Sequence, residues 1–180
     1  MQCYSGGIII NDYYSEDDHI YDRDLINEVC EMFDSVMTFF DTKTGNNRMA
    51  RRSDFTPSDF RKYLSNIALL EFKLDDEGQM EDAFCRLCGS TTTSVYGDLT
   101  GTWISDMEIQ EAYHRVKNRH KIMTNKQQGL AVKSQILSKS REYVVVRVLY
   151  IPLSDDNKAI DKLLLFVDFV DAKDKEKKSF

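Results

Sequence analysis

The clearest pattern along the chain is an apolar stripe between residues 25 and 40. Its members recur every three or four positions, which puts them on one face of an α-helix. They are Leu25, Ile26, Val29, Cys30, Phe33, Val36, Met37 and Phe40. Asp22 and Asp24 precede the stripe, and Gly45 follows it, as is typical of helix ends. The pattern predicts an amphipathic helix over residues 22–40 with one buried face.

Apolar runs further along the chain predict five β-strands. The expected strands are residues 68–74, 80–88, 130–138, 142–151 and 160–170. The turn sequence Asp75-Asp76-Glu77-Gly78 joins the first two. The last two strands are apolar on both faces apart from Arg147 and Asp168, so we expect a cover on each face of the sheet.

Three helices are expected between these elements. The first, at residues 57–67, begins at Thr56-Pro57, with proline near the first helical position. A short helix over residues 90–96 follows. A longer one over about residues 105–123 has Ser105 as its N-cap and Glu108 three residues later, which together form a capping-box sequence.

This order of elements predicts an α+β fold. We expect a five-stranded antiparallel sheet with helices on one face and the N-terminal helix covering the other. The chain divides into an acidic N-terminal extension with the amphipathic helix (1–45), a domain (46–170) and a charged tail (171–180). Residues 1–21 predict no defined element.

Several short motifs resemble a bacterial family of single-domain PAS proteins. The stretch Arg52-Ser53-Asp54-Phe55-Thr56-Pro57 is similar to the family's entry into its first helix. Arg86-Leu87-Cys88-Gly89-Ser90 is similar to the end of its second strand, and Tyr96-Gly97-Asp98-Leu99-Thr100-Gly101 to an aromatic and glycine element. The resemblance covers about residues 46–170. It implies a PAS-like fold and a role in sensing or signal relay, through a small-molecule cavity or a protein interface.

Composition excludes several classes of protein. The 180 residues carry 24 basic and 30 acidic side chains, a net charge of −6, which argues against a general nucleic-acid binder and against binding to an anionic membrane. No apolar run is long enough to span a bilayer, and the N-terminus shows no signal sequence. Four cysteines sit in apolar patterns, which favours reduced thiols in a cytoplasmic protein.

The charge is unevenly distributed. Residues 1–42 carry ten acidic side chains and one basic one, whereas residues 113–147 carry nine basic side chains and one acidic one. The two segments could be solvated faces of one domain, could attract each other within a chain or across a dimer, or the basic one could receive an anionic partner. Arg115, Lys117 and Arg119 are the candidate partner-binding residues on this basic face.

No motif for catalysis or metal binding is evident. Cys85 and Cys88 have the spacing of a zinc knuckle or redox pair, but a second pair is missing, and on a regular strand they point to opposite faces. His114 and His120 lie roughly 120° apart on a helix, so they cannot share a metal ion. The surrounding hydrophilic run disfavours a haem pocket, and the motif of flavin photosensors is absent. We expect no enzyme activity and no metal site, and the cofactor, if any, stays unidentified.

A ligand cavity would lie between the concave face of the sheet and the middle helices. Its candidate lining residues are Tyr96, Trp103, Leu130, Val132, Ser134, Val146 and Val148, together with Phe84 or Cys85 and Leu165. Each of these side chains could equally be part of the core. Tyr96 and Ser134 are the polar groups expected to contact a ligand.

The sequence therefore predicts a non-enzymatic sensory or signal-transduction domain. It would bind a small apolar or amphipathic molecule in its core, relay a signal to a partner protein, or both. The alternatives are a ligand-free adapter that uses the basic face over residues 113–147, and an enzyme on an α+β scaffold. A homodimer through the helix at residues 22–40 is also expected to be feasible, because its stripe could cover a neighbour's sheet.

Overall fold

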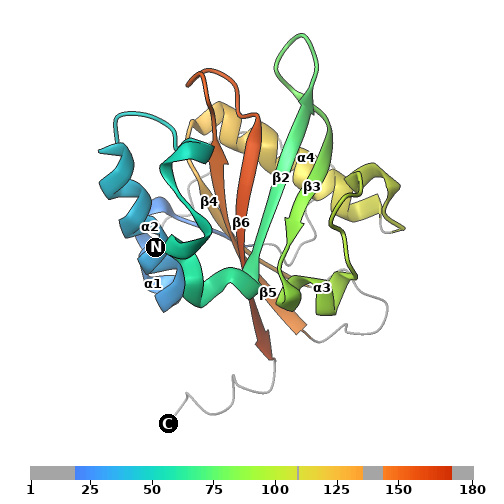
Figure 1. The fold of residues 1–180 in the computed structure, drawn as a ribbon, viewed down its shortest axis with the longest axis horizontal. Helices are drawn as coiled ribbons and strands as arrows, with labels where there is room; N and C mark the ends of the chain where they lie inside the picture. Colours follow the sequence, from blue (N-terminus) through green and yellow to red (C-terminus); the bar gives the residue numbers. More distant parts are fainter. Residues whose placement is uncertain (1–18, 109, 136–143, 172–180) are drawn as a thin grey trace.

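The computed structural model describes residues 19–108, 110–135 and 144–171 and shows an antiparallel sheet of six strands (Figure 1). The strands are β1 (His19–Tyr21), β2 (Ile67–Leu74), β3 (Met80–Cys88), β4 (Leu130–Gln135), β5 (Val144–Leu153) and β6 (Lys162–Asp171). Their order across the sheet is β1-β4-β5-β6-β2-β3. The predicted α+β class and the five predicted strands are confirmed; residues 136–138 and 142–143 of two predicted strands lie outside the described residues.

The sixth strand, β1, was not predicted. It pairs with β4 at the edge of the sheet, where His19 lies opposite Lys133 and Tyr21 opposite Ala131. Three residues are too short to show an alternating pattern, and their neighbours are acidic. These residues form a strand because they pair with β4, and that pairing is a tertiary contact.

One face of the sheet is covered by α3 (Ser90–Tyr96), the 3₁₀ turn η4 (Ile104–Asp106) and α4 (Gln110–Lys126). The predicted start of the long helix at Ser105 is wrong. The Ser105 hydroxyl donates to Asp82 Oδ2 at 2.6 Å and its backbone N–H donates to Asp82 Oδ1 at 3.2 Å, so Ser105 is bound to β3. The chain makes a separate turn there, and the helix begins at Gln110.

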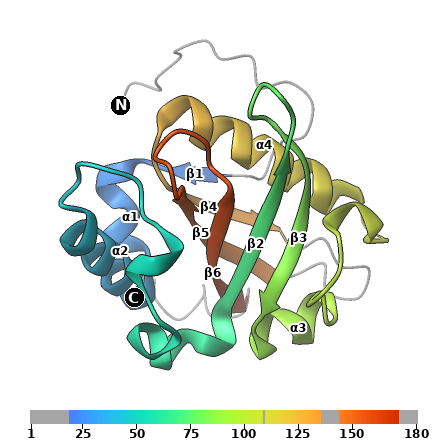
Figure 2. The ribbon, with the colours of Figure 1, turned by 45° about the horizontal axis from the view of Figure 1, so that its top comes forward.

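The opposite face is covered by α1 (Ile26–Val29) and α2 (Glu31–Thr44). Figure 2 shows this pair on one side of the strands and α4 on the other. Phe33 and Val36 are fully buried and pack with Leu149 and Phe166 of the sheet. The predicted cover for this face is confirmed, and the apolar stripe that suggested a homodimer is buried against the chain's own sheet.

The predicted single helix over residues 22–40 is broken. Residues Arg23–Leu25 form a 3₁₀ turn, η1, and Cys30 has an extended backbone (φ −166°, ψ 162°) between α1 and α2. Neither glycine nor proline causes this break. Arg147 on β5 donates to the carbonyl of Val29 at 2.8 Å and occupies an oxygen at the end of α1.

The segment between α2 and β2 contains two 3₁₀ helices, η2 (Arg52–Asp54) and η3 (Pro57–Asn66). The helix predicted for residues 57–67 is present with 3₁₀ geometry. Asp59 caps it, because its carboxylate accepts the Thr56 N–H at 2.6 Å. Gly89 follows β3 at a close approach, since a Cβ there would lie 2.5 Å from the Leu64 and Ser65 carbonyl oxygens.

The sheet separates two hydrophobic cores. On β5, Val146 and Val148 face α3 and α4, whereas Leu149 and Ile151 face α1 and α2. This alternation explains why β5 and β6 are apolar on both sides. No helix in the described part of the chain has both the length and the apolar character needed to cross a bilayer.

Candidate functional site

A small cavity lies between the sheet and the helices α3 and α4. Its volume is about 140 Å³, and its walls are mostly aliphatic side chains of β2, β5, β6 and α4. The polar or sulfur-bearing residues among its walls are Cys85, Cys88, Thr92, Tyr96, Arg115, Ser134 and Tyr150. An apolar pocket with a few polar groups is the usual form of a small-molecule site.

The structure brings together part of the predicted ligand set. Tyr96, Ser134, Val146 and Val148 line the cavity. So do Cys85 and Leu165, which were secondary candidates. Whether any of them contacts a ligand stays a prediction.

The other predicted members lie elsewhere. Leu130 and Val132 are buried in the same core but do not line the cavity. Trp103 is 38% exposed and packs edge-on against Phe84, with 5.2 Å between the ring centroids, beside the outer edge of β3. Trp103 therefore neither plugs the core nor closes this cavity.

Thr92 is a cavity residue that the sequence did not single out. Its side chain is 5% exposed, and within the described part of the chain its hydroxyl has no hydrogen-bond partner. A buried polar group without a partner is uncommon and marks a site where water or a ligand can supply the missing bond. The helix Ser90–Tyr96 was predicted, and its helical spacing places Thr92 and Tyr96 on one face.

Burial controls the protonation of Tyr96. Desolvation, with a smaller contribution from neighbouring Tyr150 and an opposing one from the positive charge of Arg115, raises the pKa of its hydroxyl to about 12. Tyr96 is therefore a neutral hydrogen-bond donor at neutral pH.

The three predicted partner-binding cations do not share one exposed face. Arg115 is half-buried and lines the cavity, and Arg119 is fully buried. Lys117 is exposed, and its ammonium donates to the Tyr113 hydroxyl at 3.3 Å. Positions four apart lie on the same side of a helix, so Arg115 and Arg119 turn inward together while Lys117 points out. Because residues 114–121 are mostly hydrophilic, the sequence pattern did not predict this inward face.

Cys85 and Cys88 both line the cavity, so the expectation that they point to opposite faces is wrong. A β-bulge causes the difference. Leu70 pairs with Cys85 and Leu69 with Leu87, which leaves Arg86 as an extra residue on β3. The extra residue shifts the alternation by one position and returns Cys88 to the face of Cys85. Both thiols are free.

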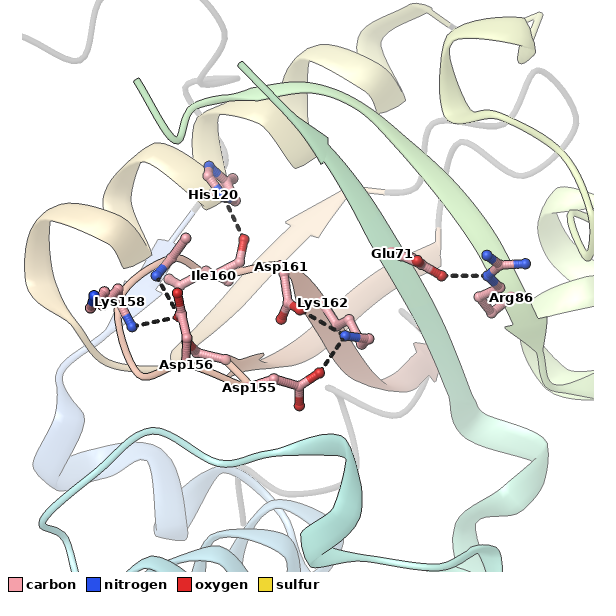
Figure 3. A network of polar contacts seen from close by, with 11 residues as sticks. Glu71, Arg86, His120, Asp155, Asp156, Lys158, Ile160, Asp161 and Lys162 are labelled. Carbon is pink, nitrogen blue, oxygen red and sulfur yellow. Dashed lines mark hydrogen bonds and ion pairs between the residues drawn. The ribbon is translucent and has the colours of Figure 1, made fainter. Parts of the chain in front are cut away.

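The charged turn between β5 and β6 is structural. Asp156 accepts the backbone N–H groups of Lys158 at 2.8 Å and Ala159 at 3.2 Å, and these bonds lower its pKa. Lys162 pairs with both Asp155 and Asp161 (Figure 3). The carboxylates are thus engaged in a turn and in ion pairs, as expected of turn acids.

The same turn is tied to α4 by a buried histidine. His120 Nε2 lies 3.1 Å from the carbonyl of Ile160, to which it donates (Figure 3). The ring packs edge-on against Phe72. Burial lowers the pKa of His120, so the ring is neutral at neutral pH. No group of three or more metal-ligating His, Cys, Asp or Glu side chains exists among residues 19–108, 110–135 and 144–171.

Comparison with known proteins gives one match. A family model described as PAS domain matches residues 31–166, a range that runs from α2 into β6. Searches of curated proteins and of solved structures gave no match.

Proposed function

Because this chain belongs to the PAS domain family, which indicates a sensory or signalling role, we propose that its cavity binds a small, mostly apolar molecule carrying one oxygen acceptor. The protein would act as a non-enzymatic sensor whose occupied and empty states differ in how the two faces of the sheet are packed.

The observation that carries this proposal is the hydroxyl of Thr92. It is buried at the wall of an apolar cavity and has no partner among the described residues. Leaving such a group unsatisfied costs about 1–3 kcal/mol. A ligand oxygen at this position would remove that cost. Tyr96 and Ser134, on the same walls, would supply further donors.

The size of the cavity limits the ligand. An engineered cavity of about 150 Å³ in another protein accommodates benzene, and this one measures about 140 Å³. The ligand class that fits is a single aromatic ring or a short aliphatic chain with a hydroxyl or carbonyl group. Haem and flavin are both far larger than benzene.

The relay would run through β5. Val146 and Val148 line the cavity, whereas Arg147 between them points to the opposite face and donates to the Val29 carbonyl. A ligand that displaces the backbone of β5 would therefore move the contact that holds α1. The output surface of the sensor would be the pair α1 and α2.

The test is titration with small probes followed by NMR chemical shifts and thermal unfolding. We expect p-cresol, which has a hydroxyl, to bind more tightly than toluene, and the perturbed signals to map to Tyr96, Ser134 and Val148. Val146→Phe fills the cavity and should abolish binding. Val145→Phe is the matched control, because it makes the same change on the opposite face of β5. Saturable binding that survives Val146→Phe, or no binding of either probe, would contradict the proposal.

A further inference from the structure

Two cysteines that the proposed function does not use lie on the cavity wall. The bulge at Arg86 brings Cys85 and Cys88 to the same face of β3, opposite Leu70 and Ala68, which also line the cavity. Hydrogen bonding between the two side chains shifts the pKa of each thiol in opposite directions. We propose that Cys85 and Cys88 form a redox-active dithiol that a small hydroperoxide entering the cavity oxidises to a disulfide.

The two thiols differ in access and in environment. Cys85 is 1% exposed, whereas Cys88 is only half-buried, so a reagent reaches Cys88 first. The single S–H of Cys85 is a donor, with the Leu87 carbonyl 3.4 Å from its sulfur and the Cys88 sulfur as the alternative acceptor. At Cys88, hydrogen bonding by Cys85, by the Thr93 side chain and by the Leu99 backbone lowers the pKa, while burial raises it. These three donors stabilise a thiolate at Cys88.

The protonation states follow the same asymmetry. The donors around Cys88 lower its pKa to about 6, while the neighbouring Cys88 and burial raise the pKa of Cys85. A low-pKa, accessible thiolate beside a second thiol is the arrangement of cysteines that sense peroxides. Cys30 provides the contrast within the chain, because burial raises its pKa.

The chemistry balances in two steps. The Cys88 thiolate attacks the terminal oxygen of the hydroperoxide, so an S–O bond forms, the O–O bond breaks, and the alkoxide leaves as an alcohol after taking up a proton. The sulfur loses two electrons to the peroxide and becomes a sulfenic acid. The Cys85 sulfur then attacks Cys88 Sγ, so the S–S bond forms, the S–O bond breaks, and the Cys85 proton leaves with the hydroxyl as water.

The proposal is independent of the cavity's natural ligand. Disulfide formation would pull the end of β3 toward its middle and alter the wall between Cys85 and Thr92. The protein would thus respond to a second signal, the peroxide concentration, at the same cavity.

The test treats the full chain with hydrogen peroxide or tert-butyl hydroperoxide and maps the products by mass spectrometry without reduction. We expect the wild type to lose two hydrogen masses and to give a Cys85–Cys88 cross-linked peptide. Cys85→Ala should stop at a sulfenic acid on Cys88, which dimedone traps. Cys88→Ser should give neither product, and the matched control Cys30→Ser should behave as wild type.

Rates give a second readout that does not require the variants to fold. In the wild type, Cys88 should react roughly tenfold faster than Cys30 at neutral pH, since its larger thiolate fraction outweighs its lower intrinsic nucleophilicity. Equal rates at Cys30 and Cys88, or Cys85 and Cys88 that stay reduced in excess peroxide, would overturn the proposal. Probe binding that Val146→Phe abolishes would still stand in that case, so the two proposals fail separately.

Discussion

Arg147 on β5 lies directly opposite Asp168 on β6 and binds its carboxylate, with Nε 2.7 Å from Oδ2. The same guanidinium donates to the Val29 carbonyl at 2.8 Å. One side chain therefore joins two strands of the sheet to the helix α1 that covers them.

Removing this contact should loosen α1. We expect Arg147→Met to lower the free energy of unfolding by about 2 kcal/mol. The substitution removes the guanidinium that binds the Asp168 carboxylate, which is 27% exposed, and the Val29 carbonyl. Amide exchange should accelerate at residues 26–30. The matched control is Lys73→Met, which removes an exposed ion pair with Glu81 and should cost less than about 1 kcal/mol. Equal losses of unfolding free energy in the two variants would contradict the role of Arg147 in holding α1 against the sheet.

Replacing Thr92 by valine should stabilise the empty protein. Thr92→Val removes a buried hydroxyl without a described partner and keeps the shape of the side chain. We expect an increase of about 1 kcal/mol, seen as a rise in Tm of about 2–4 °C. Thr91→Val, on the same helix but half-exposed, should change stability by less than about 0.5 kcal/mol. The same Thr92→Val variant should bind p-cresol more weakly than the wild type. A lower Tm would mean that the hydroxyl is satisfied in the empty cavity.

The thiol of Cys88 should titrate in the mildly acidic range. Because its pKa is lowered to about 6, the rate of its reaction with iodoacetamide should reach a plateau above neutral pH and fall by half near pH 6. The rate at Cys30 should still be rising at pH 9, since the pKa of that thiol is raised. Thr93→Val removes one donor to the Cys88 sulfur and should move its midpoint to higher pH. Peptide-resolved alkylation measures both residues in one sample.

The free energy of unfolding should decrease as the pH is lowered, because of His120. Its pKa in the folded protein lies below the ordinary 6.5, so between these two values the unfolded chain binds more protons. The contribution of the neutral ring is therefore complete above pH 6.5 and is lost as the pH falls toward the lowered folded value. Asp75, the charged group that acts on this ring, opposes part of the shift. His120→Gln keeps a donor for Ile160 and should reduce this pH dependence. Denaturant unfolding between pH 5 and 8 compares the variant with the wild type.

The strands were predictable because their signal is local. The interval Met80–Cys88 was found to the residue, and the two doubly apolar strands indicated a covered sheet. The break at Cys30 had no such signal, since the contact made at this point comes from Arg147, more than a hundred residues away. The same reason explains the misplaced start of the long helix, where Asp82 engages Ser105.

The cavity was partly predictable. Alternation on β4 and β5 selected Ser134, Val146 and Val148, and it would also have selected Tyr150. Thr92 was missed because a buried hydroxyl looks the same in a sequence as an exposed one. The joint orientation of Cys85 and Cys88 was missed because a strand pattern assumes regular pairing, which the bulge at Arg86 interrupts.

The chain itself pairs with the outer side of β4 and with part of the outer side of β3. β1 pairs along the outer side of β4, and residues 101–103 bond to the outer side of β3, where Cys85 N–H donates to the Thr102 carbonyl at 2.9 Å and Phe84 bridges to Trp103. At an exposed sheet edge, another polypeptide can add a strand by backbone pairing, which is largely insensitive to sequence. Along these two stretches a partner cannot add a strand, so a partner that approaches them has to recognise side chains, and its binding there should depend on its sequence.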